Sequence, residues 1–341
     1  MQQSILNRTK IYSTGTYLPL EIVKSDDLFA EINSESQYGI ATNWMSDKMG
    51  IVERRVAPQG SKPSDLAIPA AQQAIDEATE VDPQDIDLVI FCGIERDQPE
   101  PATAHTIQDK LGLNARYAFD IANACFGFID AMQIATNYIS CGIVKNALVV
   151  TGEVPSIIMK AILKRLKNGV DIKTAQNIIG ALSVGDAGGA AILGANKNEE
   201  TSGFQLFNTA SYSHLAEKCK YNKGDNGEIE GQMIMGQISS AFIRSHYKMI
   251  NETLSQLGWD SFDWTLTHQI GQRPFERLSS MNGVKSGKMI KTLDKLGNIT
   301  SATFPINFRK LAKSTTVKKG DKVGGCFAGS GLVVGQFGYI F

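Results

Sequence analysis

Two short, uninterrupted apolar runs restrict the folds open to this chain more than any other feature of its sequence. Residues 87–93 read DLVIFCG and residues 147–151 read ALVVT, so apolar side chains would point to both faces of each strand. Strands of this kind are typically buried on both sides, in sheets that helices cover. Helical patterns at 64–78, 102–111 and 126–142 alternate with them. We therefore expect an α/β fold with helices on both sheet faces.

The second half of the chain repeats this theme. A strand near 204–211 precedes a long helix that ends near Leu257. The segments 185–194 and 329–338 both open and close on glycines nine residues apart. An internal duplication would account for this recurrence. The remaining elements are expected as strands at 10–18 and 264–268, hairpins at 182–193 and 322–340, and helices at 41–50, 273–282, 286–295 and 301–312.

We accordingly expect two halves, residues 1–200 and 201–341. A basic helical insertion at 154–180 would belong to the first half, where a solvated helix is the plainest interpretation. Allowing for this insertion, the duplication places Cys125 and Asn298 at equivalent helix starts.

Composition excludes several classes of function. The net charge of −1 gives no electrostatic case for nucleic acid or for an anionic membrane surface. No run of about 18 apolar residues is present, so no membrane span is expected. Residues 1–13 lack the apolar core of a signal peptide. The five cysteines are widely spaced and match neither a disulfide framework nor a zinc motif, so we expect a cytoplasmic protein without a metal.

The most informative local pattern is the strand-to-helix junction at residues 119–128. Cys125 lies at this junction, where the first N–H groups of the helix have no backbone partner and the helix dipole is positive. Such a position lowers the pKa of a thiol and predicts a nucleophile. A buried structural cysteine is the competing interpretation.

Three further features become informative only together. His268 ends a buried strand, Asn298 follows Gly297 at a helix start, and Gly329–Gly331 forms a tight loop around Ser330. Taken singly, they are equally compatible with a structural histidine, a turn and a hairpin.

In their order along the chain these motifs resemble the thiolase superfamily and, within it, the ketoacyl-acyl-carrier-protein synthase III family. The resemblance covers nearly the whole sequence, and its motifs are separated from one another. They are Asn123–Phe128, Gly185–Gly188, Thr267–Gln269, Gly297–Pro305 and Gly329–Gly335. The resemblance implies a five-layered αβαβα thiolase fold and a homodimer.

The resemblance also implies the roles of the residues. Cys125 would hold an acyl group received from acyl-CoA, and the backbone N–H groups of Cys125 and Ser330 would form the oxyanion hole. His268 and Asn298 would donate hydrogen bonds to the thioester oxygen of the second substrate and stabilise its enolate. Neither a metal nor a cofactor is required.

The chain departs from the family pattern at several places. The usual His-Gln-Ala-Asn run reads His-Gln-Ile-Gly from His268, and the adenine-site segment of the family is altered near Trp44. Trp44 and Arg273 are therefore only candidate substrate-binding residues, Arg273 near the entrance for coenzyme A and the carrier protein. The family's usual Asp-Arg segment is replaced by the 154–180 insertion.

Where the chain departs from the synthase III pattern, its sequence resembles the head-to-head condensing thiolases of olefin biosynthesis. Their glutamate at the position of Glu100 reaches the active site of the partner subunit as a base, which removal of an α-proton requires. A loop carboxylate that merely faces solvent is the alternative for Glu100, which lies between Pro99 and Pro101.

The sequence therefore predicts a condensing enzyme in which acyl-CoA acylates Cys125. We favour malonyl-carrier protein as the second substrate, with decarboxylation and a 3-oxoacyl product. The first alternative is non-decarboxylative condensation of two acyl-CoAs, and the second is acyl transfer to an oxygen or nitrogen acceptor. Retention of both His268 and Asn298 argues against plain acyl transfer and against a non-enzymatic binding module.

Overall fold

Two β-sheets share one pattern of strand pairing. The computed structural model describes residues 9–196, 202–224 and 229–341. The first sheet has the order β1 (Thr9–Tyr17), β7 (Ala187–Ala195), β6 (Asn146–Glu153), β4 (Ile86–Cys92) and β5 (Tyr117–Ile121). The second has the order β8 (Gly203–Ser211), β13 (Val333–Ile340), β12 (Lys322–Gly329) and β11 (Trp264–Thr267). In each sheet a parallel pair, β4–β6 or β11–β12, is followed by two antiparallel pairs, and the first sheet has β4–β5 as a further parallel pair.

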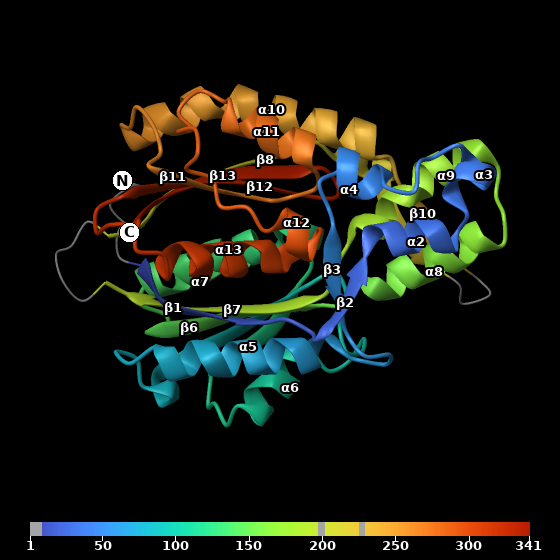
Figure 1. The fold of residues 1–341 in the computed structure, drawn as a ribbon. Helices are drawn as coiled ribbons and strands as arrows, with labels where there is room; N and C mark the ends of the chain where they lie inside the picture. The colour runs from blue at the N-terminus through green and yellow to red at the C-terminus, as the bar shows by residue number, and fades with distance from the viewer. Residues whose placement is uncertain (1–8, 197–201, 225–228) are drawn as a thin grey trace.

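Helices complete a five-layered arrangement around these sheets (Figure 1). The outer face of the first sheet is covered by α5 (Pro63–Glu77) and α6 (Thr103–Lys110). Between the sheets lie α7 (Gly127–Ser140) and α13 (Thr303–Ala312), with the short α12 (Leu293–Leu296) nearby. The second sheet is covered by α10 (Met235–Leu257) and α11 (Gln272–Ser279). The predicted α/β thiolase fold with duplicated halves is thus confirmed.

Aromatic side chains fill the space between the two sheets. Phe304 of α13 lies at the centre, with its ring centroid 5.6 Å from that of Phe128 on α7. Phe327 and Phe337 approach the same ring from the second sheet, at 5.8 and 5.6 Å. Burial of such large apolar surfaces is the dominant favourable term in folding, so this layer fixes α7 and α13 against both sheets.

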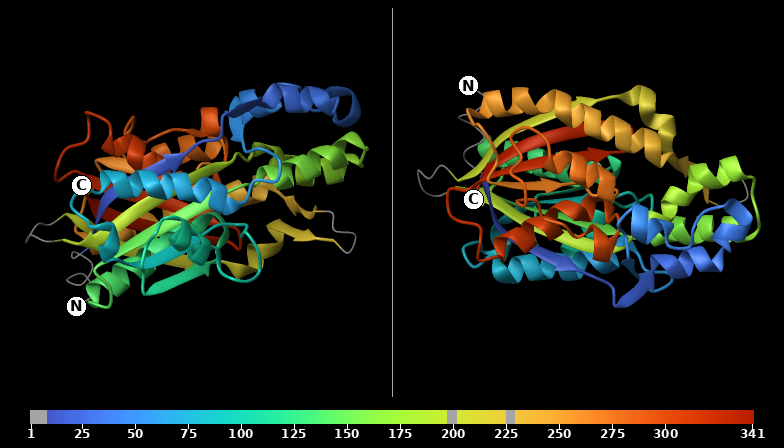
Figure 2. Two further views of the ribbon diagram at one scale, coloured as in Figure 1. Left: turned by 90° about the horizontal axis from the view of Figure 1, so that it is seen from below. Right: turned by 45° about the horizontal axis from the view of Figure 1, so that its top comes forward.

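A helical lobe projects from one end of the layered body (Figures 1 and 2). It consists of α2 (Ser25–Glu31), α3 (Ser34–Tyr38), α4 (Trp44–Lys48), α8 (Ser156–Lys167) and α9 (Ile172–Ile178). The strands β2 (Glu21–Lys24) and β3 (Glu53–Val56) connect it to the body. The predicted insertion is therefore helical, but it is more than a solvated helix. Its residues Ile162 and Leu166 are fully buried against Phe29 and Ile32.

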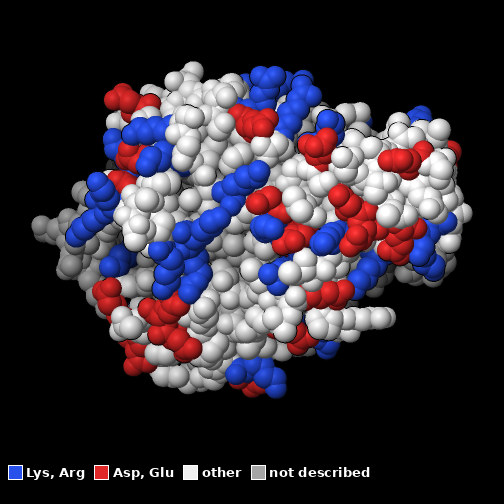
Figure 3. All heavy atoms as spheres, viewed as in Figure 1, with Lys and Arg blue, Asp and Glu red and all other residues white. Residues whose placement is uncertain are grey.

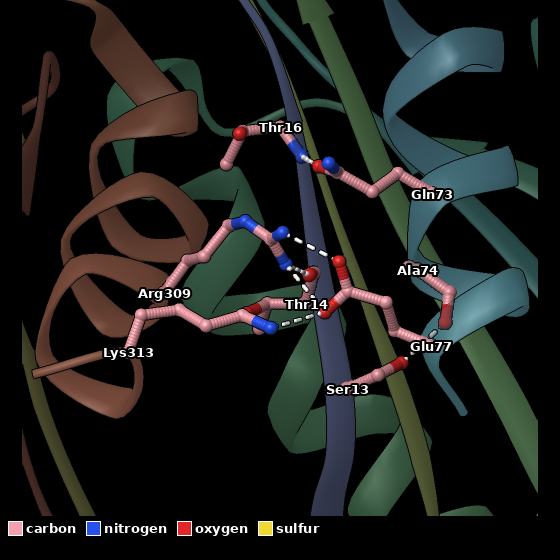
Figure 4. A network of polar contacts seen from close by, with 8 residues as sticks. All are labelled: Ser13, Thr14, Thr16, Gln73, Ala74, Glu77, Arg309 and Lys313. Carbon is pink, nitrogen blue, oxygen red and sulfur yellow. Dashed lines mark hydrogen bonds and ion pairs between the residues drawn. The ribbon is translucent and has the colours of Figure 1, made fainter. Parts of the chain in front are cut away.

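The two halves are also joined by charge (Figure 4). Glu77 of α5 accepts hydrogen bonds from Arg309 of α13, at 3.1 and 2.6 Å, and forms an ion pair with Lys313 at 2.8 Å. These hydrogen bonds lower the pKa of Glu77 to about 2. Arg309 also donates to the backbone oxygen of Thr14 on β1. Lys and Arg side chains form a row across the region of α13 on this face (Figure 3).

Several elements differ from the sequence-based expectations. Residues 182–193 do not form a hairpin, because residues 179–183 are a 3-10 helix and only the single strand β7 follows. The helix expected at 286–295 is reduced to α12, since Met289 bridges to β11 in extended conformation. The hairpin of β9 (Cys219–Lys223) and β10 (Ile229–Met233) was not expected.

The expected equivalence of Cys125 and Asn298 is wrong by three residues. Cys125 lies in the 3-10 turn η2 (Ala124–Phe126), which runs directly into α7. The matching turn η5 (Thr300–Ala302) runs directly into α13 in the same way. The residue equivalent to Cys125 is therefore Ser301. Among the described helices, none has the length and apolar composition to cross a membrane.

Candidate active site

One pocket receives the residues that the sequence singled out as catalytic. Cys125, His268, Asn298 and Ser330 all line it. Its other walls are mainly apolar and come from the β9–β10 region, α10 and the end of β12. Four groups from distant parts of the chain therefore face one apolar space.

A tight turn positions Cys125. The chain leaves β5 at Ile121 and enters η2 with Ala124 at φ 48°, in the left-handed region. The N–H of Phe126 donates to the oxygen of Asn123 at 3.1 Å, which closes the turn. The Asn123 side chain donates to Asp130 of α7 at 2.6 Å. Cys125 is thus held just before the first residue of α7 and opens onto the pocket.

The pKa predicted for Cys125 needs correction. Burial raises the pKa of this thiol well above its usual value, and repulsion by Glu153 and by Cys219, when these groups are ionised, raises it further. The effect of the helix start is outweighed, because the surrounding apolar protein disfavours a thiolate more than the turn favours it. Cys125 is therefore a thiol in the resting protein.

His268 enters the pocket from the end of β11. Its backbone N–H donates to the oxygen of Cys326 at 3.0 Å, which continues the pairing of β11 with β12. Burial lowers the pKa of His268 to about 4. The imidazole is consequently neutral near pH 7, and one ring nitrogen carries a proton while the other accepts.

Asn298 is held by backbone pairing to the first half of the chain. Its N–H donates to the oxygen of Ser183 at 2.9 Å, and its oxygen accepts from Gly185 at 3.1 Å. Asn298 Oδ1 accepts from the N–H of Thr300 at 3.0 Å. This contact orients the amide, so Nδ2 is the atom left to donate into the pocket.

The loop after β12 comes very close to the nucleophile turn. A side chain on Gly329 would lie 2.8 Å from the oxygen of Asn123 and 2.9 Å from the nitrogen of Phe126. Only glycine permits this approach, which brings Ser330 to the same pocket as Cys125. Burial raises the pKa of Cys219, and a hydrogen bond from Ser330 opposes this rise only in part.

Three residues at or near the site were missed by sequence reasoning. Cys219, at the start of β9, lines the pocket. Glu153, at the end of β6, is fully buried and accepts from the hydroxyl of Ser301 and from the N–H of Ile94 at 3.2 Å. Burial raises the pKa of Glu153 to about 7. The third, His246 on α10, is fully buried. An acidic residue ending an apolar strand was a signal for Glu153, whereas nothing local marks the other two.

Three predicted residues lie outside the pocket. Glu100 is exposed on the loop between β4 and α6, beside the edge strand β5. Arg273 is exposed on α11. Trp44 stacks on Phe29 in the lobe, with ring centroids 6.1 Å apart, so packing accounts for its position. No cluster of three or more potential metal ligands occurs in the described part of the chain.

Comparison with known proteins agrees with this geometry. The profile described as 3-oxoacyl-[acyl-carrier-protein (ACP)] synthase III matches residues 119–213, and the profile of its C-terminal part matches residues 253–337. Beta-ketoacyl-[acyl-carrier-protein] synthase III of Methylococcus capsulatus is 30% identical over 336 residues, which cover 95% of this chain and 98% of the relative. Synthase III 1 of Vibrio parahaemolyticus is 27% identical and covers 95% of this chain and 99% of its own.

Solved structures of OleA from Xanthomonas campestris are similar over almost the entire fold. The cerulenin-bound form has a TM-score of 0.91 at 25% identity and covers 98% of both chains. A form with bound lauric acid and lauroyl-CoA has a TM-score of 0.90 at 25% identity and covers 98% of this chain and 99% of OleA.

Fold and family together define a thiolase-fold condensing enzyme that acts on thioesters. The chain belongs to the β-ketoacyl-[acyl-carrier-protein] synthase III family, and its structure resembles the OleA branch.

Proposed function

We propose that this protein condenses two acyl-CoA thioesters head to head, without decarboxylation, and releases a 2-alkyl-3-oxoacyl thioester. The observation that carries the proposal is the convergence of Cys125, His268, Asn298 and Ser330 on one apolar pocket. Of the two condensations predicted from the sequence, the likeness to OleA favours the non-decarboxylative one, although the sequence alone favoured the other.

The first half-reaction transfers an acyl group to Cys125. The sulfur attacks the thioester carbonyl, and the backbone N–H groups of Cys125 and Ser330 stabilise the oxyanion. Coenzyme A leaves as a thiol and takes away the proton that Cys125 gives up. Because the thiol of Cys125 is protonated at rest, attack and proton loss are coupled in this step. Apolar side chains such as Leu215, Phe242 and Ile270 suit an alkyl chain.

The second half-reaction forms the carbon–carbon bond. Asn298 Nδ2 and the neutral His268 ring donate to the thioester oxygen of the second acyl-CoA, where negative charge develops as an α-proton is removed. The resulting carbanion attacks the acyl group on Cys125. The Cys125–acyl bond breaks, and the sulfur recovers a proton from the base.

Glu100 of a second copy of the chain is our candidate for that base. Glu100 does not line the pocket of its own subunit. Its loop lies beside β5, which forms an edge of the first sheet. Asp120 of β5 fixes the loop by accepting from the N–H groups of Thr103 and Ala104, at 2.8 and 2.9 Å. Pairing of β5 with its copy across a two-fold axis would bring the loop to the partner's pocket. We therefore also propose a homodimer.

The solved OleA variants support this assignment. They carry substitutions of a glutamate, a cysteine and a histidine, in the same chain order as Glu100, Cys125 and His268. The glutamate-to-cysteine separation and the cysteine-to-histidine separation each differ by one residue from those in this chain.

Isotope exchange tests the base directly. Acyl-CoA deuterated at the α-carbon should lose label with the native enzyme but not with Glu100→Gln, while both proteins still form the Cys125 adduct. Glu95→Gln is the matched control, because Glu95 lies on the same loop and has the same charge. Equal exchange in Glu100→Gln and native enzyme would reject Glu100 as the base, and a monomer by light scattering would reject its delivery from a partner.

Decarboxylative condensation with malonyl-carrier protein is the second candidate. It is favoured by the 30% identity to a protein named β-ketoacyl-[acyl-carrier-protein] synthase III. In that reaction the loss of carbon dioxide generates the carbanion. Glu100→Gln would therefore leave the rate of condensation with malonyl-carrier protein unchanged.

A further inference from the structure

A second histidine lies buried close to the active site. His246 of α10 is fully buried, and its ring packs edge-on against Phe242 at 4.7 Å between centroids. Phe242 lines the active-site pocket, but His246 does not. A buried imidazole is costly unless its nitrogens are hydrogen-bonded, so the partners of this ring need an explanation.

Gln336 of β13 determines where His246 carries its proton. The Gln336 amide nitrogen lies 3.1 Å from the backbone oxygen of His246 and 3.2 Å from its Nδ1. A backbone oxygen can only accept, so the amide atom facing it must be the donating nitrogen. The same nitrogen therefore donates to Nδ1. In the neutral ring the proton must then reside on Nε2.

The strand register places Gln336, the partner of His246, two strands away from His268. Gln336 of β13 pairs with Cys326 of β12, which pairs with Thr267 of β11, the residue before His268. The rings are near enough that positive charge on His268 lowers the pKa of His246, which burial has already lowered, to about 3. Within the described chain, His246 Nε2 and His268 Nδ1 are both buried and have no hydrogen-bond partner.

We propose that His246 is a positioning residue that donates from Nε2 to Nδ1 of His268 through one bridging water. Because His268 Nδ1 then accepts, its proton resides on Nε2, the atom that faces the substrate. The opposite tautomer would present a lone pair to the thioester oxygen and repel the developing enolate. This inference rests on the proposed role of His268.

Nitrogen NMR tests the tautomers without relying on catalysis. The chain has only four histidines, so long-range proton–nitrogen spectra of ¹⁵N-histidine protein can be assigned with single variants. At pH 7 we expect both His246 and His268 to be neutral, with their protons on Nε2. A proton on Nδ1 of His246 in the native protein would overturn the proposal, whether or not the variants fold.

Two substitutions then separate positioning from packing. His246→Leu should leave His268 as a mixture of tautomers, whereas His246→Gln, whose amide can donate from nearly the same position, should restore the Nε2–H form. Condensation should fall about 10- to 100-fold in His246→Leu, the loss seen when the outer partner of a metal-bound histidine is removed. Formation of the Cys125 adduct should stay at the native rate.

Each other result has a defined meaning. An unchanged His268 tautomer in His246→Leu, or equal losses of acylation and condensation, would overturn the proposal. If the native enzyme forms no condensation product at all, the proposed function fails, but the tautomers still decide whether His246 orients His268.

Discussion

The two halves of this molecule build the same turn twice and use it differently. In each half a 3-10 turn leads directly into a helix between the sheets, and its first residue has a left-handed backbone, with φ of 48° at Ala124 and 50° at Thr300. Cys125 and Ser301 are the second residues of these turns. Cys125 opens onto the pocket, whereas Ser301 is 1% exposed.

Hydrogen bonding explains this difference. Ser301 is bonded to Glu153 and, at 2.6 Å, to the hydroxyl of Thr151, so its oxygen is fully occupied by the first half. The second half reaches the pocket instead with Asn298, three residues upstream. The turn therefore supplies position only, and the strands that face it decide whether its second residue opens onto the pocket.

The largest effect should follow from removing Cys125, the proposed nucleophile of this pair. Cys125→Ala should abolish the acyl adduct formed from octanoyl-CoA, because no other thiol lies on such a turn. Intact-protein mass spectrometry would measure it. Ser301→Ala and Cys219→Ala are the controls, and both should keep the adduct. If the mass of Cys125→Ala still increased by one acyl group, the nucleophile would be misassigned.

The second test concerns the donors that face the nucleophile. His268→Ala and Asn298→Ala should still be acylated but should condense about 10²–10³-fold more slowly, the usual cost of losing one oxyanion donor. Rapid-quench measurement of adduct and product separates the two steps. If either variant lost both steps equally, its proposed role in enolate stabilisation would be wrong.

A smaller effect should come from Glu153, which links the two turns. Its charge raises the pKa of Cys125, and its own pKa is about 7. Glu153→Gln should therefore speed alkylation of Cys125 by iodoacetamide several-fold at pH 8, and should change it little at pH 6, where native Glu153 is already protonated. The ratio of the rates at the two pH values is the readout. An identical ratio in both proteins would show that this charge does not reach Cys125.

The sequence predicted the parts of the site that local pattern determines. The strand-to-helix junction located Cys125, and the glycines at 329 and 331 located the loop around Ser330. The pKa of Cys125 was mispredicted because the closing of the pocket depends on segments far along the chain, such as β9 with Cys219. His246 was missed for the same reason, since its partner Gln336 is 90 residues away. Spacing along one helix cannot reveal such a contact.

The remaining prediction is a pH dependence of stability that reports on the buried histidines. Their folded-state pKa values of about 3 and about 4 lie below the ordinary value of 6.5. Between pH 6.5 and pH 4 the unfolded chain therefore binds more protons than the folded chain. The free energy of unfolding should consequently fall as the pH decreases from 6.5 toward 4. Urea unfolding at several pH values would measure this slope. In His246→Leu the slope should be shallower, and an unchanged slope would contradict neutral burial of His246.

The central claim is that two acyl-CoA molecules are joined in one pocket without a malonyl donor. Mass spectrometry of the products from octanoyl-CoA, with and without malonyl-carrier protein, tests it most directly. Head-to-head condensation should give a sixteen-carbon 2-alkyl-3-oxoacyl product, or the acid and ketone derived from it, from octanoyl-CoA alone. A ten-carbon 3-oxoacyl product that appears only when malonyl-carrier protein is added, with release of carbon dioxide, would contradict it.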